Sequence, residues 1–177
     1  MNFIYVTDCN ISSTEEFVTK LAVEKFNYSN PIICRNEHGK PYFAPNENNP
    51  PLHFSVSHTD NKLFVVFSKN KIGLDVENKQ RQVNYRKILR KIDACFPIAS
   101  TFEFLELWTA KESVVKYFGG TIATDAKSIR FSPAFDCVEY HQKPLPVYIQ
   151  HLEFENHLVC VCSEAQDEFS ICKINLL

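Results

Sequence analysis

Short apolar segments separated by turn residues are the feature that most constrains the fold of this chain. Phe54 to Ser57 alternates apolar and polar side chains, as a half-buried strand does. Leu63 to Phe67 and Ile72 to Val76 are apolar runs of strand length, and the polar stretch from Ser68 to Lys71 between them is typical of a turn. The pattern predicts a hairpin made of these two runs.

Further strands and three helices are predicted from the same periodicities. The strand candidates are Phe3 to Val6, Ser128 to Phe131, Val147 to Phe154, His157 to Cys162 and Phe169 to Ile174, with short extended pieces at Ile32 to Cys34 and Tyr42 to Phe43. The helices are expected at about 14–26, after the capping box Ser13 to Glu16, at 83–92, and at 102–118, before Gly119-Gly120. Strands and helices joined by short antiparallel connections favour an α+β fold over a doubly wound parallel sheet.

Length, charge and apolar content exclude several classes of protein. The 177 residues suit one domain or two small lobes, and 45% hydrophobic residues with 15 Phe supply a core. A formal net charge of -2 gives no reason to expect nucleic acid or an anionic membrane as a partner. Met1 to Val6 has no basic signal region, and no segment approaches the roughly 20 apolar residues of a membrane span. We therefore expect a cytoplasmic protein.

The cysteines favour buried thiols over a metal or redox site. There are seven of them, with no CxxC pair: Cys9, Cys34, Cys95, Cys137, Cys160, Cys162 and Cys172. Cys160 and Cys162 lie two apart in an apolar run, so on a strand they share one face.

Two carboxylates stand side by side in Gly73-Leu74-Asp75-Val76-Glu77. On a strand, Asp75 and Glu77 point to the same face, and neighbouring carboxylates repel unless a cation or solvent separates them. Oxygen ligands of this kind suit magnesium or manganese. The alternative is an acidic strand end that faces solvent.

A stripe of functional residues is also predicted on the third helix. Trp108, Glu112 and Lys116 recur every four residues and therefore lie along one helix face. The alternatives are a helix-stabilising Glu–Lys pair and a tryptophan that packs in the core.

Two smaller elements could contact phosphate. Ser57-His58 follows the strand at 54–57, and Gly39-Lys40-Pro41 places a basic side chain on a rigid turn. A hydrogen-bonded boundary histidine is the simpler interpretation of the first element.

In this order and spacing, the four elements together resemble the 4′-phosphopantetheinyl transferase superfamily, in its monomeric two-lobed type. The specific part is Asp-x-Glu followed by Trp-x-x-Lys-Glu-x-x-x-Lys, and the matching motifs lie between Gly39 and Lys116. The resemblance implies transfer of 4′-phosphopantetheine from coenzyme A to a serine of an apo carrier protein. It also implies two similar lobes with mainly antiparallel sheets and a ligand cleft between them, here residues 1–71 and 72–177.

The resemblance assigns roles to individual residues. It implies a Mg²⁺ site, with Mn²⁺ as the alternative ion, made by Asp75, Glu77 and Glu112. Glu112 is then the favoured catalytic base, and Lys116 contacts the coenzyme A diphosphate. The predicted coenzyme A contacts are Lys40, Pro41, Ser57, His58, Asp75 and Lys116. Lys111 matches the motif without an expected direct contact.

The basic run from Lys79 to Lys91 is the expected docking surface for an acidic acyl or peptidyl carrier protein. A solvated helix face is the alternative. Members of the family carry several basic residues near the N-terminus that bind the 3′-phosphate. Between Met1 and Cys34 this chain has only Lys20 and Lys25, and Arg35 is a candidate substitute.

Two rival functions share the same carboxylates. One is a metal-dependent phosphoesterase or phosphotransferase that acts on another small substrate without a carrier protein. The other is a coenzyme A-binding module without turnover. The sequence leaves open which carrier protein or pathway is served.

Overall fold

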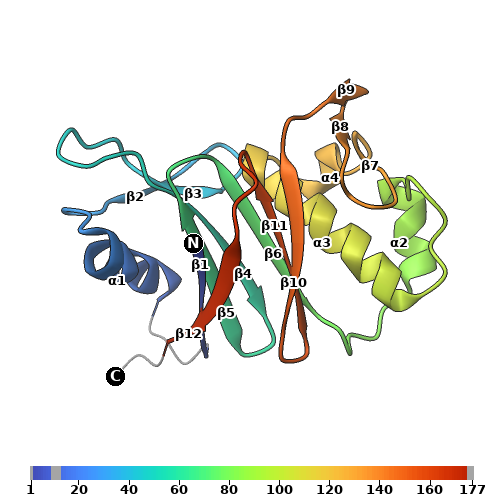
Figure 1. Cartoon of the computed structure of the whole chain (residues 1–177), viewed down its shortest axis with the longest axis horizontal. Helices are drawn as coiled ribbons and strands as arrows, with labels where there is room; N and C mark the ends of the chain where they lie inside the picture. The colour runs from blue at the N-terminus through green and yellow to red at the C-terminus, as the bar shows by residue number, and fades with distance from the viewer. Residues whose placement is uncertain (1, 9–12, 175–177) are drawn as a thin grey trace.

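Two β-sheets pack against each other between helices in the computed structural model, which describes residues 2–8 and 13–174 (Figure 1). The first sheet has the strand order β12-β1-β5-β4 and the second has the order β10-β11-β6. Ile4 and Phe64 of the first sheet share a buried cluster with Leu74 and Val159 of the second. The α+β class predicted from the sequence is therefore confirmed.

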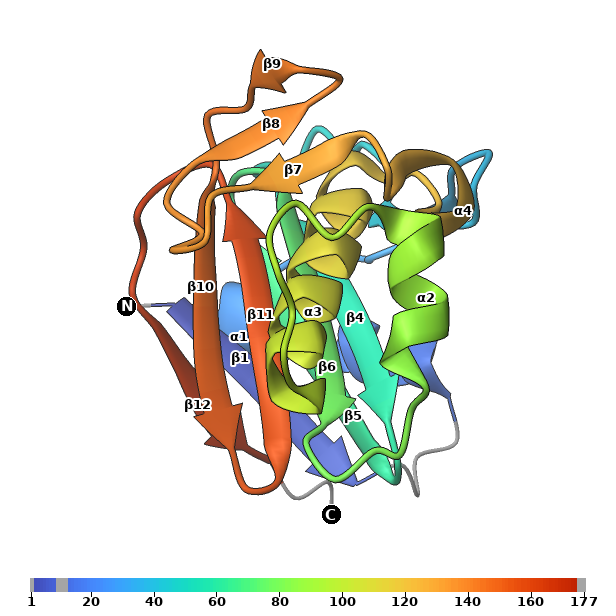
Figure 2. The same cartoon turned by 90° about the vertical axis from the view of Figure 1, so that its right-hand side faces the viewer.

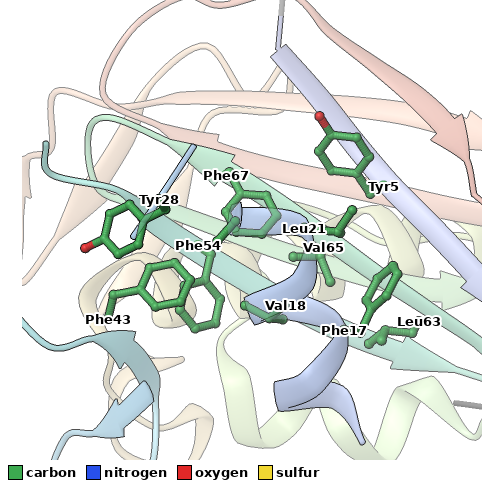
Figure 3. Packing of buried hydrophobic residues seen from close by; sticks show 11 residues of the cluster. Tyr5, Phe17, Val18, Leu21, Tyr28, Phe43, Phe54, Leu63, Val65 and Phe67 are labelled. Carbon is green, nitrogen blue, oxygen red and sulfur yellow. The ribbon is translucent and has the colours of Figure 1, made fainter. Parts of the chain in front are cut away.

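The first sheet is covered on its outer face by the helix α1. Its strands and helix have these bounds: β1 Asn2–Asp8, α1 Thr14–Phe26, β4 His53–Thr59, β5 Lys62–Ser68 and β12 Phe169–Lys173. Figure 3 shows Phe17 and Leu21 of α1 packed with Leu63 and Phe67 of β5 in one buried cluster. The side chain of Ser13 accepts hydrogen bonds from the N–H groups of the first turn of α1, as the capping box predicts.

The second sheet carries the long helix α3 on its outer face, with α2 beside that helix (Figure 2). The elements of this half are β6 Ile72–Asn78, α2 Tyr85–Ile92, α3 Thr101–Phe118, β10 Tyr148–Phe154 and β11 His157–Ser163. Gly119 ends α3 in the left-handed conformation, as expected for a glycine after a helix.

The predicted hairpin between the runs at 63–67 and 72–76 is wrong. Both edges of β5 are occupied within the first sheet, by β1 and by β4, whereas β6 pairs with β11 in the second sheet. The turn at 68–71 therefore carries the chain from one sheet to the other. The apolar runs identify the strands but carry no information about which edges are already filled.

The two halves of the sequence are not confined to separate sheets. Strand β12, near the C-terminus, pairs in parallel with β1. The division into lobes at residues 71 and 72 stays a prediction.

Several short elements were not predicted from the sequence. They are α4 Ile122–Asp125, β8 Val138–Tyr140 and β9 Lys143–Pro144. The strand predicted at 128–131 is confirmed as β7 Ile129–Phe131. The extended pieces predicted at 32–34 and 42–43 are confirmed as β2 Ile33–Arg35 and β3 Pro41–Phe43, which pair in a further small sheet. Of the seven cysteines, Cys9 lies outside the described residues. Cys160 and Cys162 are free, buried and in one cluster, as predicted.

Within residues 2–8 and 13–174, none of the helices has the length and apolar character that a transmembrane span requires.

Candidate active site

Strands β4 and β6 meet where the two sheets come together, and serine side chains join them. Ser55 Oγ accepts a hydrogen bond from the backbone N–H of Leu74 at 3.0 Å, and Ser57 Oγ accepts one from that of Val76 at 3.2 Å. These hydroxyls satisfy backbone donors on the edge of β6 that would otherwise be buried without partners. We call this line of hydrogen bonds from Ser55 and Ser57 of β4 to β6 the seam. It orients β6 so that Leu74 and Val76 pack against the first sheet, while Asp75 and Glu77 face α3.

Helix α3 approaches β6 unusually closely because residue 73 is a glycine. A Cβ atom at that position would lie 1.9 Å from the backbone oxygen of Ser113 and 2.6 Å from the backbone nitrogen of Tyr117. No side chain fits in that space. The glycine two residues before Asp75 therefore brings the helix backbone within reach of the strand carboxylates.

The stripe predicted on α3 runs along the carboxylates of β6. Lys116 Nζ donates to Asp75 Oδ1 at 2.7 Å, and the indole of Trp108 lies near enough to Glu77 to favour the charged form of that carboxylate. Trp108 and Lys116 are eight residues, about 12 Å, apart along the helix, whereas Asp75 and Glu77 are only about 6.6 Å apart along the strand, so the two helix side chains approach the carboxylates from opposite ends. Glu112 stands between the two contacts on the same helix face and interacts electrostatically with both carboxylates.

The environment of Glu112 disfavours its charged form. Burial raises the pKa of Glu112 to about 7, and the negative charges of Asp75 and Glu77 contribute to this rise, whereas Lys116 opposes it. Burial also raises the pKa of Glu77, an effect that the guanidinium of Arg81 partly offsets. Such a shift is expected for carboxylates that lack enough positive charge around them.

The donor set of Asp75, Glu77 and Glu112 fits a hard divalent cation. All three side chains offer carboxylate oxygens, the ligands that Mg²⁺ and Mn²⁺ prefer, and their mutual repulsion would be relieved by a cation. Across the described part of the chain, however, no group of three or more His, Cys, Asp or Glu side chains is arranged as a ready metal site. Asp75 instead pairs with Lys116, and Glu77 pairs with Arg81. A cation would have to displace these two ion pairs.

A cavity of about 320 Å³ opens beside Glu112 and Lys116. It lies between the C-terminal end of α3, strand β4 and the turn that carries Gly39, Lys40 and Pro41. Its size is that of a small-molecule pocket, and it joins the two sequence motifs that are farthest apart in the chain.

Lys40 is bound to protein in this structure. Its ammonium donates to the backbone oxygen of Lys116, and also to those of Tyr117 and Ile72, both at 3.4 Å. Burial lowers the pKa of Lys40 to about 8. The lysine therefore caps the C-terminus of α3 while its stem lines the cavity, and a phosphate contact would require it to leave these carbonyls.

His58 lies on the other side of the seam. Its Nε2 atom is 3.0 Å from Thr14 Oγ1 at the start of α1, and burial lowers its pKa. It lines a polar pocket with Glu77 and Arg81. Arg35, the candidate for the 3′-phosphate, forms an ion pair with Glu15 at 2.7 Å.

Lys111 has a structural role that the sequence pattern did not reveal. Its side chain is fully buried, and Nζ donates to the backbone oxygens of Ala126, at 2.7 Å, and Ile129. These bonds fasten α3 to the chain between α4 and β7. The sequence motif could not predict these hydrogen bonds of Lys111, because their acceptors are backbone carbonyls, which every residue has.

We expect Lys111→Met to lower the free energy of unfolding by about 1–3 kcal/mol, because two buried carbonyls lose their donor. Urea denaturation measures the loss. Lys127→Met, at an exposed position in the same region, is the control and should change stability by less than about 0.5 kcal/mol. Equal stabilities of the two variants would contradict the structural role.

Comparison with known proteins gives matches in one family. The model of the ACPS family, described as the 4′-phosphopantetheinyl transferase superfamily, matches residues 71–163, more than half of the chain. The 4′-phosphopantetheinyl transferase AcpT of Escherichia coli K12 is 28% identical over 143 residues, which cover 75% of this chain and 66% of that protein. The 4′-phosphopantetheinyl transferase gsp of Aneurinibacillus migulanus is 25% identical over 162 residues, which cover 84% of this chain and 66% of that protein. The chain thus spans 66% of the length of both relatives.

Proposed function

The chain belongs to the 4′-phosphopantetheinyl transferase superfamily, and from this premise we propose that it transfers 4′-phosphopantetheine from coenzyme A to a serine of an apo carrier protein. The observation that carries the proposal is the convergence of Glu112, Lys116 and Asp75 beside a cavity, within the segment that the family model matches.

In the proposed reaction, the serine hydroxyl oxygen attacks the phosphorus that bears the pantetheine arm. A new P–O bond forms to serine, the diphosphate P–O bond breaks, and adenosine 3′,5′-bisphosphate leaves. Such a transfer depends mainly on positioning and on stabilisation of negative charge, without a covalent enzyme intermediate.

Glu112 is the proposed acceptor of the serine proton. Burial raises the pKa of Glu112 to about 7 in the protein without a cation, and a bound cation would lower this pKa and keep the carboxylate ionised to accept the proton. Lys116 is proposed to place its ammonium on the diphosphate, where negative charge grows as the leaving group departs. In the structure that ammonium pairs with Asp75, so it would exchange one anionic partner for another.

Asp75, Glu77 and Glu112 are proposed to hold Mg²⁺ or Mn²⁺. When bound, such an ion neutralises the diphosphate and orients the leaving group. Arg81 would then release Glu77, because the ion supplies the positive charge that the guanidinium supplies in this structure.

The cavity is proposed to receive part of coenzyme A. Lys40 and Pro41 line it, Ser57 lies at the seam beside it, and His58 faces the polar pocket across the seam. We propose that this region belongs to the cleft between two similar lobes, residues 1–71 and 72–177. A monomer and a cytoplasmic location are parts of the same proposal.

The carrier protein is proposed to dock along residues 79–91. The basic side chains of α2 are exposed and its apolar residues Ile88, Leu89 and Ile92 pack inward. The exposed set is Arg86, Lys87, Arg90 and Lys91. The segment directly follows β6, which carries the proposed metal ligands, so a carrier bound there would have its serine close to the site.

We expect the double charge reversal Arg86→Glu/Arg90→Glu to raise the carrier-protein KM at least about tenfold at low salt, with kcat nearly unchanged, because like charges then meet across the interface. The control is Lys20→Glu/Lys25→Glu on α1, which changes the net charge equally on the opposite side of the molecule (Figure 1). An unchanged carrier-protein KM in the α2 variant would contradict the proposal that the carrier docks along residues 79–91.

The proposed reaction is distinguished from its rivals by product release. Adenosine 3′,5′-bisphosphate should appear from coenzyme A and Mg²⁺ only when an apo carrier protein is present. Release of a phosphorylated product without carrier would identify a phosphoesterase. Binding of coenzyme A without release, across fatty-acid, polyketide and peptide carriers, would identify a binding module.

A further inference from the structure

The hydroxyl of Ser57 lies at the junction of the seam and the proposed metal site. It accepts from the backbone N–H of Val76 at 3.2 Å and from Lys116 Nζ at 3.1 Å, and it donates to Asp75 Oδ1 at 3.0 Å. The residue is 4% exposed. One side chain therefore joins β4, β6 and α3 at a single atom.

The hydrogen-bonding capacity of this hydroxyl is fully used. A serine hydroxyl has one donor proton and two acceptor lone pairs. Ser57 spends the proton on Asp75 and the two lone pairs on Val76 and Lys116. A phosphate oxygen of coenzyme A needs a donor, and this hydroxyl has none to spare while it donates to Asp75.

The bonds to Asp75 fix the direction of its carboxylate. Within the described residues, the hydrogen bonds of Ser57 and Lys116 both end on Oδ1. Because the Ser57 bond does not involve the ammonium, it persists if Lys116 moves to a phosphate. The carboxylate then stays oriented at the moment when a cation replaces Lys116 as its positive partner.

We propose that Ser57 is a positioning residue that holds Asp75 ready for the divalent cation, and that it is not a direct contact of the nucleotide. The inference rests on the proposed function, because it assumes that Asp75 is a ligand of the cation. Groups that orient metal ligands typically contribute 10- to 100-fold to metal affinity.

Ser55 is a matched control within the same strand. It makes the same kind of seam bond, to the N–H of Leu74, and has no bond to Asp75 or Lys116 among the contacts of the described chain. Loss of either hydroxyl removes one backbone bond, and only loss of the Ser57 hydroxyl releases the carboxylate. Comparison of the two variants therefore separates a general role in stability from a specific role at Asp75.

The experiment measures Mn²⁺ binding to the whole protein by electron paramagnetic resonance of free Mn²⁺, with thermal unfolding recorded for each variant. We expect Ser57→Ala to weaken Mn²⁺ binding about 10- to 100-fold, and Ser55→Ala to leave it within about threefold. Ser57→Ala should lose at least as much thermal stability as Ser55→Ala, because it removes three hydrogen bonds and Ser55→Ala removes one. Ser57→Cys, which keeps the branching of the side chain, is slightly larger and hydrogen-bonds weakly, replaces the Ala variant if that variant does not fold.

Coenzyme A affinity without metal supplies the second measurement. The proposal expects it to be unchanged in the Ser57 variants. Wild-type Mn²⁺ affinity in these variants, or a loss confined to metal-free coenzyme A binding, would overturn the positioning role, as would a wild-type protein that binds no Mn²⁺. If Mn²⁺ binding falls as expected while no carrier protein is modified, the positioning role stands and the proposed transfer fails.

Discussion

Substitution of Glu112 by glutamine is expected to reduce kcat about 10²- to 10⁴-fold, because the variant keeps the shape of the side chain and loses its ability to accept a proton. Glu112 stands on α3 between the contacts of Trp108 and Lys116, and no other carboxylate of that stripe can replace it. The measurement is the rate of transfer to an apo carrier at saturating coenzyme A and Mg²⁺.

Glu106→Gln is the matched control. Glu106 lies on the same helix and burial also raises its pKa, but it has no place in the proposed site. Activity of Glu106→Gln should therefore equal that of the wild type. An active Glu112→Gln variant would exclude Glu112 as the base.

Stability measurements show whether Glu112→Gln loses activity because the base is missing or because the protein unfolds. The pKa of Glu112 is raised from 4.5 to about 7 in the folded protein, so the stability that it contributes is complete below pH 4.5 and is lost as the pH rises through 7. Without divalent cation, Glu112→Gln should thus equal the wild type at pH 4 and exceed it at pH 8. The gain is at most about 3 kcal/mol, reduced because the carboxylate is only partly buried.

Substitution of Gly73 by alanine is expected to be the most damaging change outside the chemical site. The added Cβ would overlap the backbone of Ser113 and Tyr117, and both contacts are with main-chain atoms that cannot rotate away. Helix α3 would have to move off β6, which would break the contact of Lys116 with Asp75. We expect a loss of about 4 kcal/mol or more in the free energy of unfolding, or no folded protein.

Gly39→Ala is the comparison that isolates this packing effect. Gly39 has a positive φ of 84°, but a Cβ there would meet no atom within 4 Å. Its cost should be only the roughly 1 kcal/mol of an alanine in that backbone conformation. Chemical denaturation of both variants, or soluble yield where Gly73→Ala does not fold, measures the difference. Equal costs would show that α3 does not depend on close approach at Gly73.

The sequence predicted the elements of the site better than their surroundings. Asp75 and Glu77 share a strand face, and Trp108, Glu112 and Lys116 share a helix face, because both regularities follow from local backbone periodicity. The sequence did not reveal that α3 lies on that face of β6. That contact depends on the absence of a side chain at Gly73, which a motif records only as a glycine.

Interactions with backbone groups were the least predictable part. Lys40 was expected to contact coenzyme A and Lys111 had no expected contact, yet both donate to carbonyls of distant segments. The hairpin expected between β5 and β6 failed for a similar reason, since strand pairing depends on which edges are free after the whole sheet has formed. Ser55 and Ser57 were predicted as the polar face of a strand, and that face proved to be a seam between the sheets.

The most direct test of the account is intact-mass spectrometry of an apo carrier protein incubated with this protein, coenzyme A and Mg²⁺. The proposed transfer predicts a mass gain of one phosphopantetheine unit that is absent when the carrier serine is replaced by alanine and when Glu112→Gln is used as the enzyme. A folded wild-type protein that modifies no fatty-acid, polyketide or peptide carrier would contradict it.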